Sequence, residues 1–319
     1  MKLIRLNSFL YLFCILSVFA SCVQKPDSSV EDWNRTFINT KKLISEACLD
    51  RELILGRPFL IQYVDSSLLI YDDIGDSLFL LVDLKENDRV YRFGQKGEGN
   101  NEFLQVFAFC NMKSDSILGV YDAYKHELRE INLDKVKRGE MNFPVVFKDT
   151  LSSIKLSPTK YDAYLGLGFY ESNMLSLTDN SIGSKFFFEY PYKDSREKAI
   201  SNRLRGMAYQ GTLCSNRSLD KFLYAVCSAP IFMLFSVNKD GIEKTYELIG
   251  GYPNYVTEET GEYRSAPMSA DNKMSFTMAY ATDNYIYLLY SGKNFRDAGM
   301  DAFKANVIYQ LSWNGKPIN

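Results

Sequence analysis

The sequence predicts an all-β protein built from repeated small sheets. From residue 57 onward, short apolar runs alternate with turn residues, and helical periodicity is scarce. Tyrosine and phenylalanine contribute 22 residues each, and such rings favour the pleated, half-buried surface of a sheet. Hydrophobic residues make up 46% of the chain and charged residues 24%. These values are typical of a folded, water-soluble protein and exclude a disordered chain or a polytopic membrane protein.

The apolar runs recur along the chain. In each repeat a first run is followed, after a polar interruption, by a second. A unit of roughly 45 residues or somewhat more, holding several short strands, is typical of a propeller blade, which covers its faces by packing against neighbouring blades. The longer intervals late in the chain indicate insertions on one rim, where binding loops usually lie. The first runs begin at Leu68, Ile117, Tyr164, Phe222 and Tyr285.

Three stretches resemble the bacterial TolB-like six-bladed β-propeller lipoproteins. Residues 92–103, RFGQKGEGNNEF, are similar to the blade-linking segment G-x-x-G-x-G-P-G-E-[FY], with Asn100-Asn101 where Pro-Gly is usual. Residues 281–293 and 307–317 are similar to the C-terminal half of that group. The resemblance implies six blades and a further strand set after the W-x-G-x-P turn, but the sequence ends two residues past Pro317. We therefore expect a six-bladed type of propeller whose last blade is incomplete, or an open ring.

The N-terminal residues predict export and an anchor. Lys2 and Arg5 form a basic start, and residues 9–20 form an apolar stretch. That stretch is too short to span a bilayer but suits the hydrophobic region of a secretion signal. Phe19-Ala20-Ser21-Cys22 resembles a bacterial lipobox, in which small residues precede a cysteine that receives diacylglycerol. An ordinary secretory signal followed by a chance cysteine is the alternative.

These features divide the chain into three parts. We predict a lipoprotein signal peptide over residues 1–21, a lipidated Cys22 with a flexible tether over residues 22–34, and a propeller domain over residues 35–319. The lipid would hold the domain at the outer membrane, and the sequence leaves open which side it faces. Acyl chains contribute about 0.8 kcal/mol per buried methylene, so no other membrane segment is required.

Four cysteines remain in the mature chain after Cys22. None of their spacings is a metal-binding C-x-x-C pair. One possibility is a disulfide between Cys214 and Cys227 on neighbouring strands. The other is that Cys110 and Cys227 are unpaired thiols buried in hydrophobic strands. The sequence does not settle the disulfide state of Cys48, Cys110, Cys214 and Cys227.

The glycine-rich segment from Gly94 to Gly99 invites comparison with a phosphate-binding loop. It lacks the third glycine of G-x-G-x-x-G, because Glu102 occupies that place, and no G-K-[ST] follows. Glycines also permit positive φ in tight connections. We therefore interpret the segment as a turn between blades.

Acidic residues follow two predicted inner strands. Asp72, Asp73 and Asp122 could line the central channel and bind calcium, which would make the protein a metal-assisted hydrolase or lyase. More often, an aspartate after a strand caps a turn by accepting backbone N–H bonds. The single histidine, His126, lies between two predicted strands, and no G-x-S-x-G elbow accompanies it. Catalysis by a serine triad or by zinc is therefore disfavoured.

The remaining candidates for binding are aromatic side chains in a long insertion. Tyr252, Tyr255, Tyr263 and Arg264 precede the fifth repeat and could form a platform for a sugar or peptide. They could equally fasten that loop to the propeller. The formal net charge of -2 gives no basic face for nucleic acid. The favoured function is a monomeric, lipid-anchored, non-enzymatic envelope propeller that needs no cofactor and binds a protein, peptide or glycan.

Overall fold

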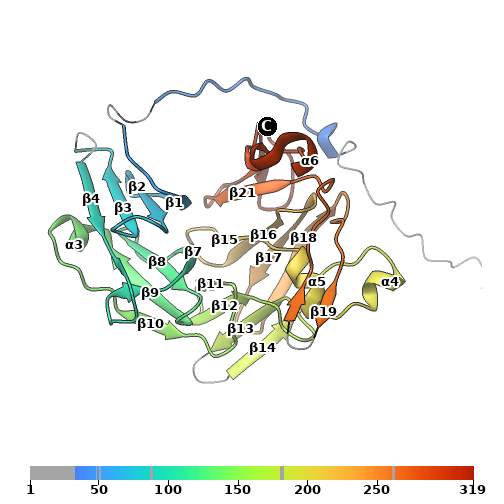
Figure 1. The fold of residues 1–319 in the computed structure, drawn as a ribbon, viewed down its shortest axis with the longest axis horizontal. Helices are drawn as coiled ribbons and strands as arrows, with labels where there is room; N and C mark the ends of the chain where they lie inside the picture. The colour runs from blue at the N-terminus through green and yellow to red at the C-terminus, as the bar shows by residue number, and fades with distance from the viewer. Residues whose placement is uncertain (1–32, 48, 50–51, 87–88, 180–182, 261–262) are drawn as a thin grey trace, which may run out of the picture.

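The computed structural model describes residues 33–47, 49, 52–86, 89–179, 183–260 and 263–319. The predicted lipidation site Cys22 and the thiol of Cys48 lie outside these residues. Within them the chain forms antiparallel sheets arranged around an axis as the blades of a propeller (Figure 1). Each blade is a meander whose strands follow one another in chain order from the axis outward. The predicted all-β propeller fold is confirmed.

The described residues form five blades, of which four have four strands and the fifth has three. The strands of the first three blades are β1 (Pro58–Val64), β2 (Ser67–Asp72), β3 (Phe79–Asp83) and β4 (Arg89–Phe93); β7 (Val106–Asn111), β8 (Ile117–Asp122), β9 (Glu127–Asn132) and β10 (Val145–Lys148); and β11 (Lys155–Pro158), β12 (Ala163–Leu167), β13 (Leu175–Asp179) and β14 (Gly183–Phe187). Those of the last two are β15 (Gly211–Ser215), β16 (Lys221–Val226), β17 (Ile231–Val237) and β18 (Ile242–Ile249); and β21 (Phe276–Ala281), β22 (Tyr285–Tyr290) and β23 (Val307–Ser312).

Smaller elements lie in the connections. Two strand pairs stand apart from the blades, and short helical segments lie in several of the connections. The pairs are β5 (Gln95–Lys96) with β6 (Glu102–Phe103) and β19 (Glu258–Thr260) with β20 (Tyr263–Ser265). The helical segments are α3 (Leu133–Lys137), α4 (Ser195–Lys198), α5 (Asn202–Ala208), α6 (Phe295–Ala298) and the 3₁₀ helix η1 (Gly299–Phe303).

The long connections gather on one rim. In an antiparallel meander, the link from the second strand to the third and the link to the next blade leave from the same end of the sheet. Residues 94–105, 168–174, 188–210, 250–275 and 291–306 are all links of these two kinds. We call this side the insertion rim. The opposite rim carries shorter turns, apart from the segment around α3.

The hydrophobic core lies between the blades. Four clusters of buried residues fill the four interfaces from blade 1 to blade 5. Phe79 of blade 1, for example, contacts Phe93 at 5.2 Å and Phe103 at 4.9 Å between ring centroids. Each such ring buries about 150–250 Å² and so dominates the packing of its interface. The abundance of phenylalanine and tyrosine is explained largely by these interfaces.

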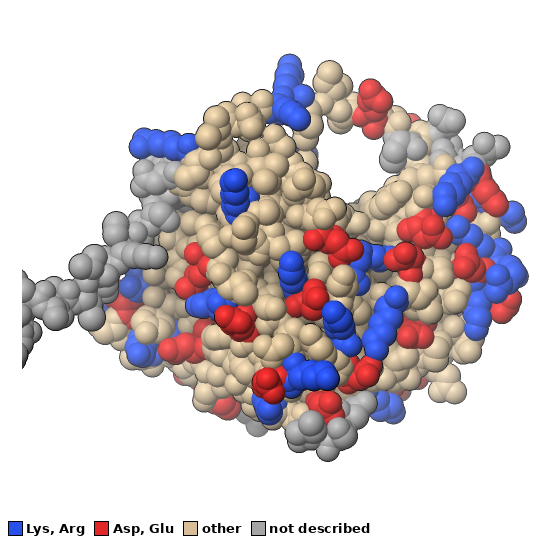
Figure 2. All heavy atoms as spheres, turned by 180° about the vertical axis from the view of Figure 1, so that it is seen from behind, with Lys and Arg blue, Asp and Glu red and all other residues tan. Residues whose placement is uncertain are grey.

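The ring is open between blade 5 and blade 1. No sheet occupies this position among the described residues, and the chain before β1 crosses it as an extended strap (Figure 1). Figure 2 shows the opening beneath that strap from behind. The expectation of an open ring or an incomplete last blade is therefore met: the described residues form five blades, and the last of these lacks its outer strand.

The strap begins at an aromatic anchor on blade 5. Trp33 is buried, and its ring lies 4.6 Å from Tyr309 and 5.0 Å from Phe37, centroid to centroid. The Tyr309 hydroxyl donates a hydrogen bond to Asn34 Oδ1 at 2.6 Å. Trp33 and Asn34, which fall in the predicted tether, are thus part of the packed body.

The possible disulfide between Cys214 and Cys227 is not formed. Cys110, Cys214 and Cys227 are all free thiols. The strand register explains this, because Cys214 pairs with Leu223, while Cys227 lies beyond the far end of the same hairpin. Burial raises the pKa of the Cys214 thiol to about 12 and that of Cys227 to about 11, so both stay protonated at neutral pH.

Candidate functional site

The predicted calcium ligands Asp72 and Asp73 are already engaged. The Asp72 carboxylate accepts hydrogen bonds from the backbone N–H groups of Gly56 at 2.6 Å and Arg57 at 2.7 Å. Burial alone would raise the pKa of Asp72, but these backbone donors outweigh it and hold the pKa below its usual value. Asp73 accepts two hydrogen bonds from the Arg57 guanidinium, at 2.7 and 2.6 Å. Both carboxylates therefore hold in place the segment that leads into β1 of blade 1.

Asp122 has the same role in blade 2. Its carboxylate is fully buried and accepts backbone N–H bonds from Leu104 at 2.6 Å and Gln105 at 3.2 Å. Tyr124 and Lys125 also donate their backbone N–H groups to it, each at 3.1 Å. Asp122 therefore caps a turn, because its carboxylate oxygens, which a cation would need as ligands, already accept these backbone N–H groups.

The described residues contain no group of three or more His, Cys, Asp or Glu side chains that could hold a metal ion. Asp162 and Asp283, which also lie in turns next to inner strands, contact Lys113 and Ser218 respectively. A cavity of about 20 Å³ lies between the inner strands and holds little more than one water molecule. Its lining contains no carboxylate and comprises Gln62, Phe109, Cys110, Asn111, Cys214, Ser215, Ala279, Tyr280 and Ala281.

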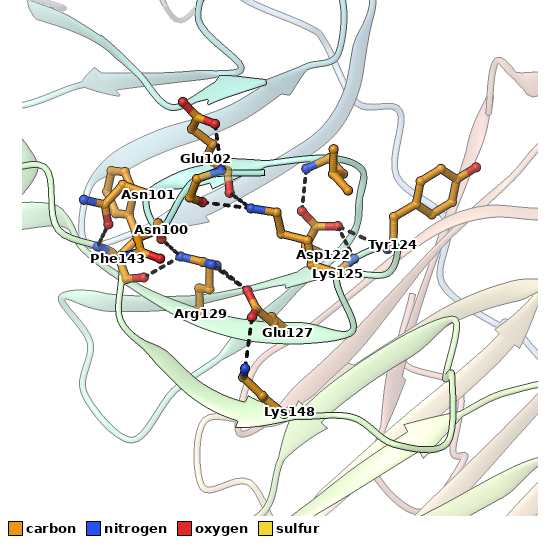
Figure 3. Close-up of polar contacts among 12 residues, drawn as sticks. Asn100, Asn101, Glu102, Asp122, Tyr124, Lys125, Glu127, Arg129, Phe143 and Lys148 are labelled. Atoms are coloured by element: carbon orange, nitrogen blue, oxygen red, sulfur yellow. Dashed lines mark hydrogen bonds and ion pairs between the residues drawn. The ribbon is translucent and has the colours of Figure 1, made fainter. Parts of the chain in front are cut away.

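The glycine-rich segment closes on itself rather than forming an anion cradle. β5 and β6 pair in parallel, and Glu102 Oε2 accepts the Gly99 N–H at 2.8 Å (Figure 3). Gly94 has a φ of +72°, and a Cβ there would lie 2.5 Å from the Phe79 ring. Lys125 Nζ donates to the carbonyl oxygens of Gly99 at 2.9 Å and Glu102 at 2.8 Å. The segment is a turn between blades, as predicted.

The departure from Pro-Gly at Asn100-Asn101 adds contacts to blade 2. The Asn101 side chain accepts the Phe143 N–H at 3.1 Å (Figure 3). Its amide nitrogen donates to the Met141 carbonyl at 3.1 Å. The buried Arg129 donates to the carbonyl oxygens of Asn100 and Phe143 and forms an ion pair with Glu127 at 2.5 Å. We call residues 94–103 with these partners the blade 1–2 junction. It serves a structural role.

His126 occupies the turn between β8 and β9, as predicted. It adopts a φ of +55° and is half-buried, and its backbone carbonyl accepts the Asp149 N–H at 2.8 Å. Its Nδ1 is buried without a hydrogen-bond partner in the described part of the chain. Among the described residues, no acidic or nucleophilic side chain is hydrogen-bonded to this nitrogen, as a catalytic base would need.

The four predicted binding residues in the long insertion separate into two groups. The Tyr255 hydroxyl donates to Glu197 Oε1 at 2.8 Å, and its ring, like that of Tyr252, packs on the core between blades 3 and 4. Burial and this bond raise the pKa of Tyr255 above its usual value. Tyr263 is 63% exposed on β20, where Arg264 pairs with Glu259 at 3.1 Å. Tyr255 therefore fastens the loop, and only Tyr263 and Arg264 face solvent.

A cleft on the insertion rim beside blade 3 was not foreseen from the sequence. It has a volume of about 580 Å³, within the usual range of ligand pockets. Three aromatic rings line it, together with one positive and one negative side chain. The lining residues are Leu151, Ser152, Phe169, Tyr170, Glu171, Ser172, Asn173, Phe186 and Arg203. We call it the rim cleft.

The walls of the rim cleft are held by buried polar contacts. The Tyr170 hydroxyl is hydrogen-bonded to Ser153 Oγ at 2.7 Å and Ser176 Oγ at 2.9 Å, and burial raises the pKa of Tyr170 to about 12. The Tyr170 ring lies edge to face against Phe186, with 5.3 Å between ring centroids. A neutral, well-fixed tyrosine thus presents its ring beside the exposed ring of Phe186.

Helix α5 supplies the positive side of the cleft. It begins after Ser201, whose hydroxyl accepts the Leu204 N–H, a usual N-cap contact. The Asn202 amide donates to the carbonyl oxygens of Tyr170 at 3.0 Å and Asn173 at 2.8 Å, which ties the helix to the opposite wall. This leaves the Arg203 side chain exposed at the cleft.

A family model for TolB-like 6-blade propeller-like proteins matches residues 36–319 of the chain. The chain belongs to this family. The family's description gives six blades, whereas the described residues of this TolB-like propeller form five, and the sixth position is the open one. No curated protein matches the TolB-like chain.

Several solved structures share the general shape of this TolB-like chain. A member of the DUF4221 family from Bacteroides vulgatus has 11% identity and a TM-score of 0.46, covering 83% of this chain and 80% of its own. A β-propeller domain from Myceliophteria thermophila has 11% identity and a TM-score of 0.42, covering 85% and 88%. An auxiliary nutrient binding protein from Bacteroides ovatus has 9% identity and a TM-score of 0.43, covering 83% and 57%. At these values, the three structures do not bear on what this chain binds.

Among the described residues, no helix is long and apolar enough to cross a membrane. The surface seen in Figure 2 carries lysine and arginine interspersed with aspartate and glutamate, with no extended field of one sign on that face.

Proposed function

We propose that this TolB-like propeller is a non-enzymatic binding module anchored to the cell envelope by a lipid on Cys22. The observation that supports binding is the rim cleft, which combines pocket size, aromatic walls and two opposite charges on the rim that carries the long connections. Loops held by a rigid scaffold are the usual place for binding residues. The anchor is supported by the lipobox-like residues 19–22.

The lining of the cleft suits a glycan or a short peptide segment. The rings of Phe169, Tyr170 and Phe186 offer flat apolar surfaces, which provide contact area at a low cost in conformational entropy. Arg203 and Glu171 stand at the same cleft and can donate and accept hydrogen bonds to polar groups of the ligand. Such a mixture of apolar walls with a few polar groups fixes the orientation of a bound molecule.

Binding is tested with the acyl-free protein on a glycan array and a peptide library. We expect a ligand whose affinity falls at least tenfold in both Phe186→Ala and Arg203→Gln. The matched control is Phe303→Ala, because Phe303 lies on the same rim and is 45% exposed, against 44% for Phe186. If the ligand binds equally to all four proteins, the rim cleft is not its site. If the control alone weakens binding, the site lies near η1.

The anchor is tested separately by Cys22→Ala with membrane fractionation and metabolic acyl labelling. The wild-type protein should be labelled and sediment with membranes, whereas the variant should lose the label and become soluble. A variant that stays labelled and membrane-bound would contradict the lipid assignment without affecting the assignment of the cleft.

A further inference from the structure

The opening between blade 5 and blade 1 is bordered by two apolar sheet faces. On β1, every second side chain points away from blade 2: Phe59, Ile61 and Tyr63 are 52%, 47% and 51% exposed. The intervening Leu60 packs instead against the core between blades 1 and 2. The inner strand of blade 1 therefore presents an unpartnered apolar row to the opening.

Blade 5 presents a similar row from the other side. Met278, Leu289 and Ile308 are neighbours in register across β21, β22 and β23, and Met278 and Ile308 are 36% and 44% exposed. Tyr285, on the same face of β22 as Leu289, is 38% exposed. The opposite face of this sheet packs against blade 4 through Ile286 and other residues. Each face lacks the neighbour that every other blade interface has.

The strap across this opening carries apolar side chains of its own. Ile38, Leu43 and Ile44 are 93%, 69% and 82% exposed in its extended form. Residues 38–47 exceed the usual length of a strand, which is about five to six residues. The strap that carries these side chains crosses the opening that the two unpartnered faces border (Figure 1).

Both ends of the strap are fixed to the borders of the opening. Trp33 and Phe37 pack on blade 5 through Tyr309, and the Gly56 and Arg57 N–H groups bind Asp72 of blade 1. A segment held at both ends meets the faces between them at a high effective concentration. A second copy of the chain or a partner strand would instead have to enter beneath the strap.

We propose that residues 38–47 fold into the opening and pack against both faces, closing the ring in place of a sixth blade. Ile38, Leu43 and Ile44 then cover the row on β1 and the row on blade 5. The strap is the chosen occupant because it is attached at both borders and supplies the missing apolar partner. Closure is independent of the ligand proposed for the rim cleft.

Trypsin tests this closure, because Lys41 and Lys42 lie in the middle of the segment. The probe is the full mature chain with Cys22→Ser, and cleavage after these lysines is followed by mass spectrometry. In the wild-type protein, cleavage there should be slow and independent of protein concentration. Ile44→Asp in the strap and Ile61→Asp on β1 should each accelerate it at least tenfold.

Two controls decide the result. Val256→Asp, at a site that is 67% exposed outside the opening, should leave the cleavage rate unchanged, and circular dichroism should show that all variants keep their sheet. Wild-type cleavage as fast as that of Ile44→Asp would overturn the proposal, as would a folded Ile61→Asp protein cleaved at the wild-type rate. Protection that appears only at high protein concentration would also overturn it, in favour of a second copy as the occupant.

Discussion

Two buried arginines show how differently two regions of this propeller are built. Arg129, at the blade 1–2 junction, is 3% exposed, and its nitrogens donate to Glu127 and to the carbonyl oxygens of Asn100 and Phe143. Arg205, on α5 of the insertion rim, is 2% exposed, and its Nη2 donates to Glu189 at 2.8 Å. Its Nε and Nη1 have no hydrogen-bond partner among the described residues.

The difference separates structure from candidate function. At the blade 1–2 junction, the polar side chains are hydrogen-bonded to backbone groups. The glycine-rich segment, which most resembles a motif, therefore has few free polar groups for a ligand. On the rim beside blade 3, the rings and charges of the cleft stay accessible, and the helix beneath them is less completely paired. Residue type alone therefore does not show which region is free to bind a ligand, because that depends on how many of its polar groups already have a partner.

The largest expected effect is a difference in the free energy of unfolding between variants of the two arginines. Arg129→Met should lower the free energy of unfolding by about 3 kcal/mol, because it leaves Glu127 and two carbonyl groups without their buried donor. Arg205→Met should cost less than about 1 kcal/mol, since Glu189 can turn to water and the apolar side chain removes two unpaired donors. Urea unfolding measures both. Equal losses would show that the two environments do not differ as described.

A second prediction concerns the carboxylate that caps the turn in blade 2. Asp122→Asn should destabilise the protein by about 2 kcal/mol, because an amide replaces an acceptor for several backbone N–H groups with a group that itself donates. Asp162→Asn, on the exposed opposite rim, should leave the urea midpoint unchanged. If added calcium stabilises the wild-type protein but not Asp122→Asn, the carboxylate binds a cation after all.

A third prediction tests the fastening of the long insertion. Tyr255→Phe should cost about 1 kcal/mol, since Glu197 loses one hydroxyl donor but keeps that of Tyr209 at 2.9 Å. Tyr263→Phe should not change stability, because this hydroxyl lies at an exposed position. Thermal unfolding compares the two variants. If Tyr263→Phe lost more stability than Tyr255→Phe, the β19–β20 hairpin would be what fastens the insertion.

The smallest effect is the dependence of stability on pH. Burial would raise the pKa of Asp83, but its ion pair with Lys137, at 2.5 Å, and the backbone donors of Lys85 and Glu86 hold it below the usual value, as backbone donors do for Asp72. Both groups therefore stabilise the fold above pH about 4, near the pKa of an unfolded aspartate, and lose this contribution as the pH falls further. Asp83→Asn should flatten the fall of the urea midpoint below pH 4. An unchanged slope would contradict the assignment.

The architecture could be predicted because each blade is specified by patterns within its own stretch of sequence. Alternating apolar runs, turn residues and the repeat spacing specify the blades, and the long late intervals specify the side that carries the insertions. The turn role of the segment from Gly94 to Glu102 was also predictable, since its glycines do not match a phosphate loop. The number of sheets depends on which segments pair, so the sequence could narrow it only to an incomplete or open ring.

The rim cleft could not be predicted because its residues come from separate connections. Ser152, Tyr170, Phe186 and Arg203 lie in four different segments and meet only when blade 3 packs beside its neighbours. Tyr255 was ambiguous for the same reason: its partner Glu197 is 58 residues away. The only signal in the sequence was the length of the connections, which indicates a rim but no particular side chain.

Hydrogen–deuterium exchange on the complex with a captured ligand tests the central claim most directly, because it reads both regions at once. We predict that the ligand slows exchange in residues 168–174 and in α5, while residues 94–103 of the blade 1–2 junction exchange at the same rate with and without it. Protection of the junction instead, or of neither region, would contradict the assignment of binding to the rim cleft.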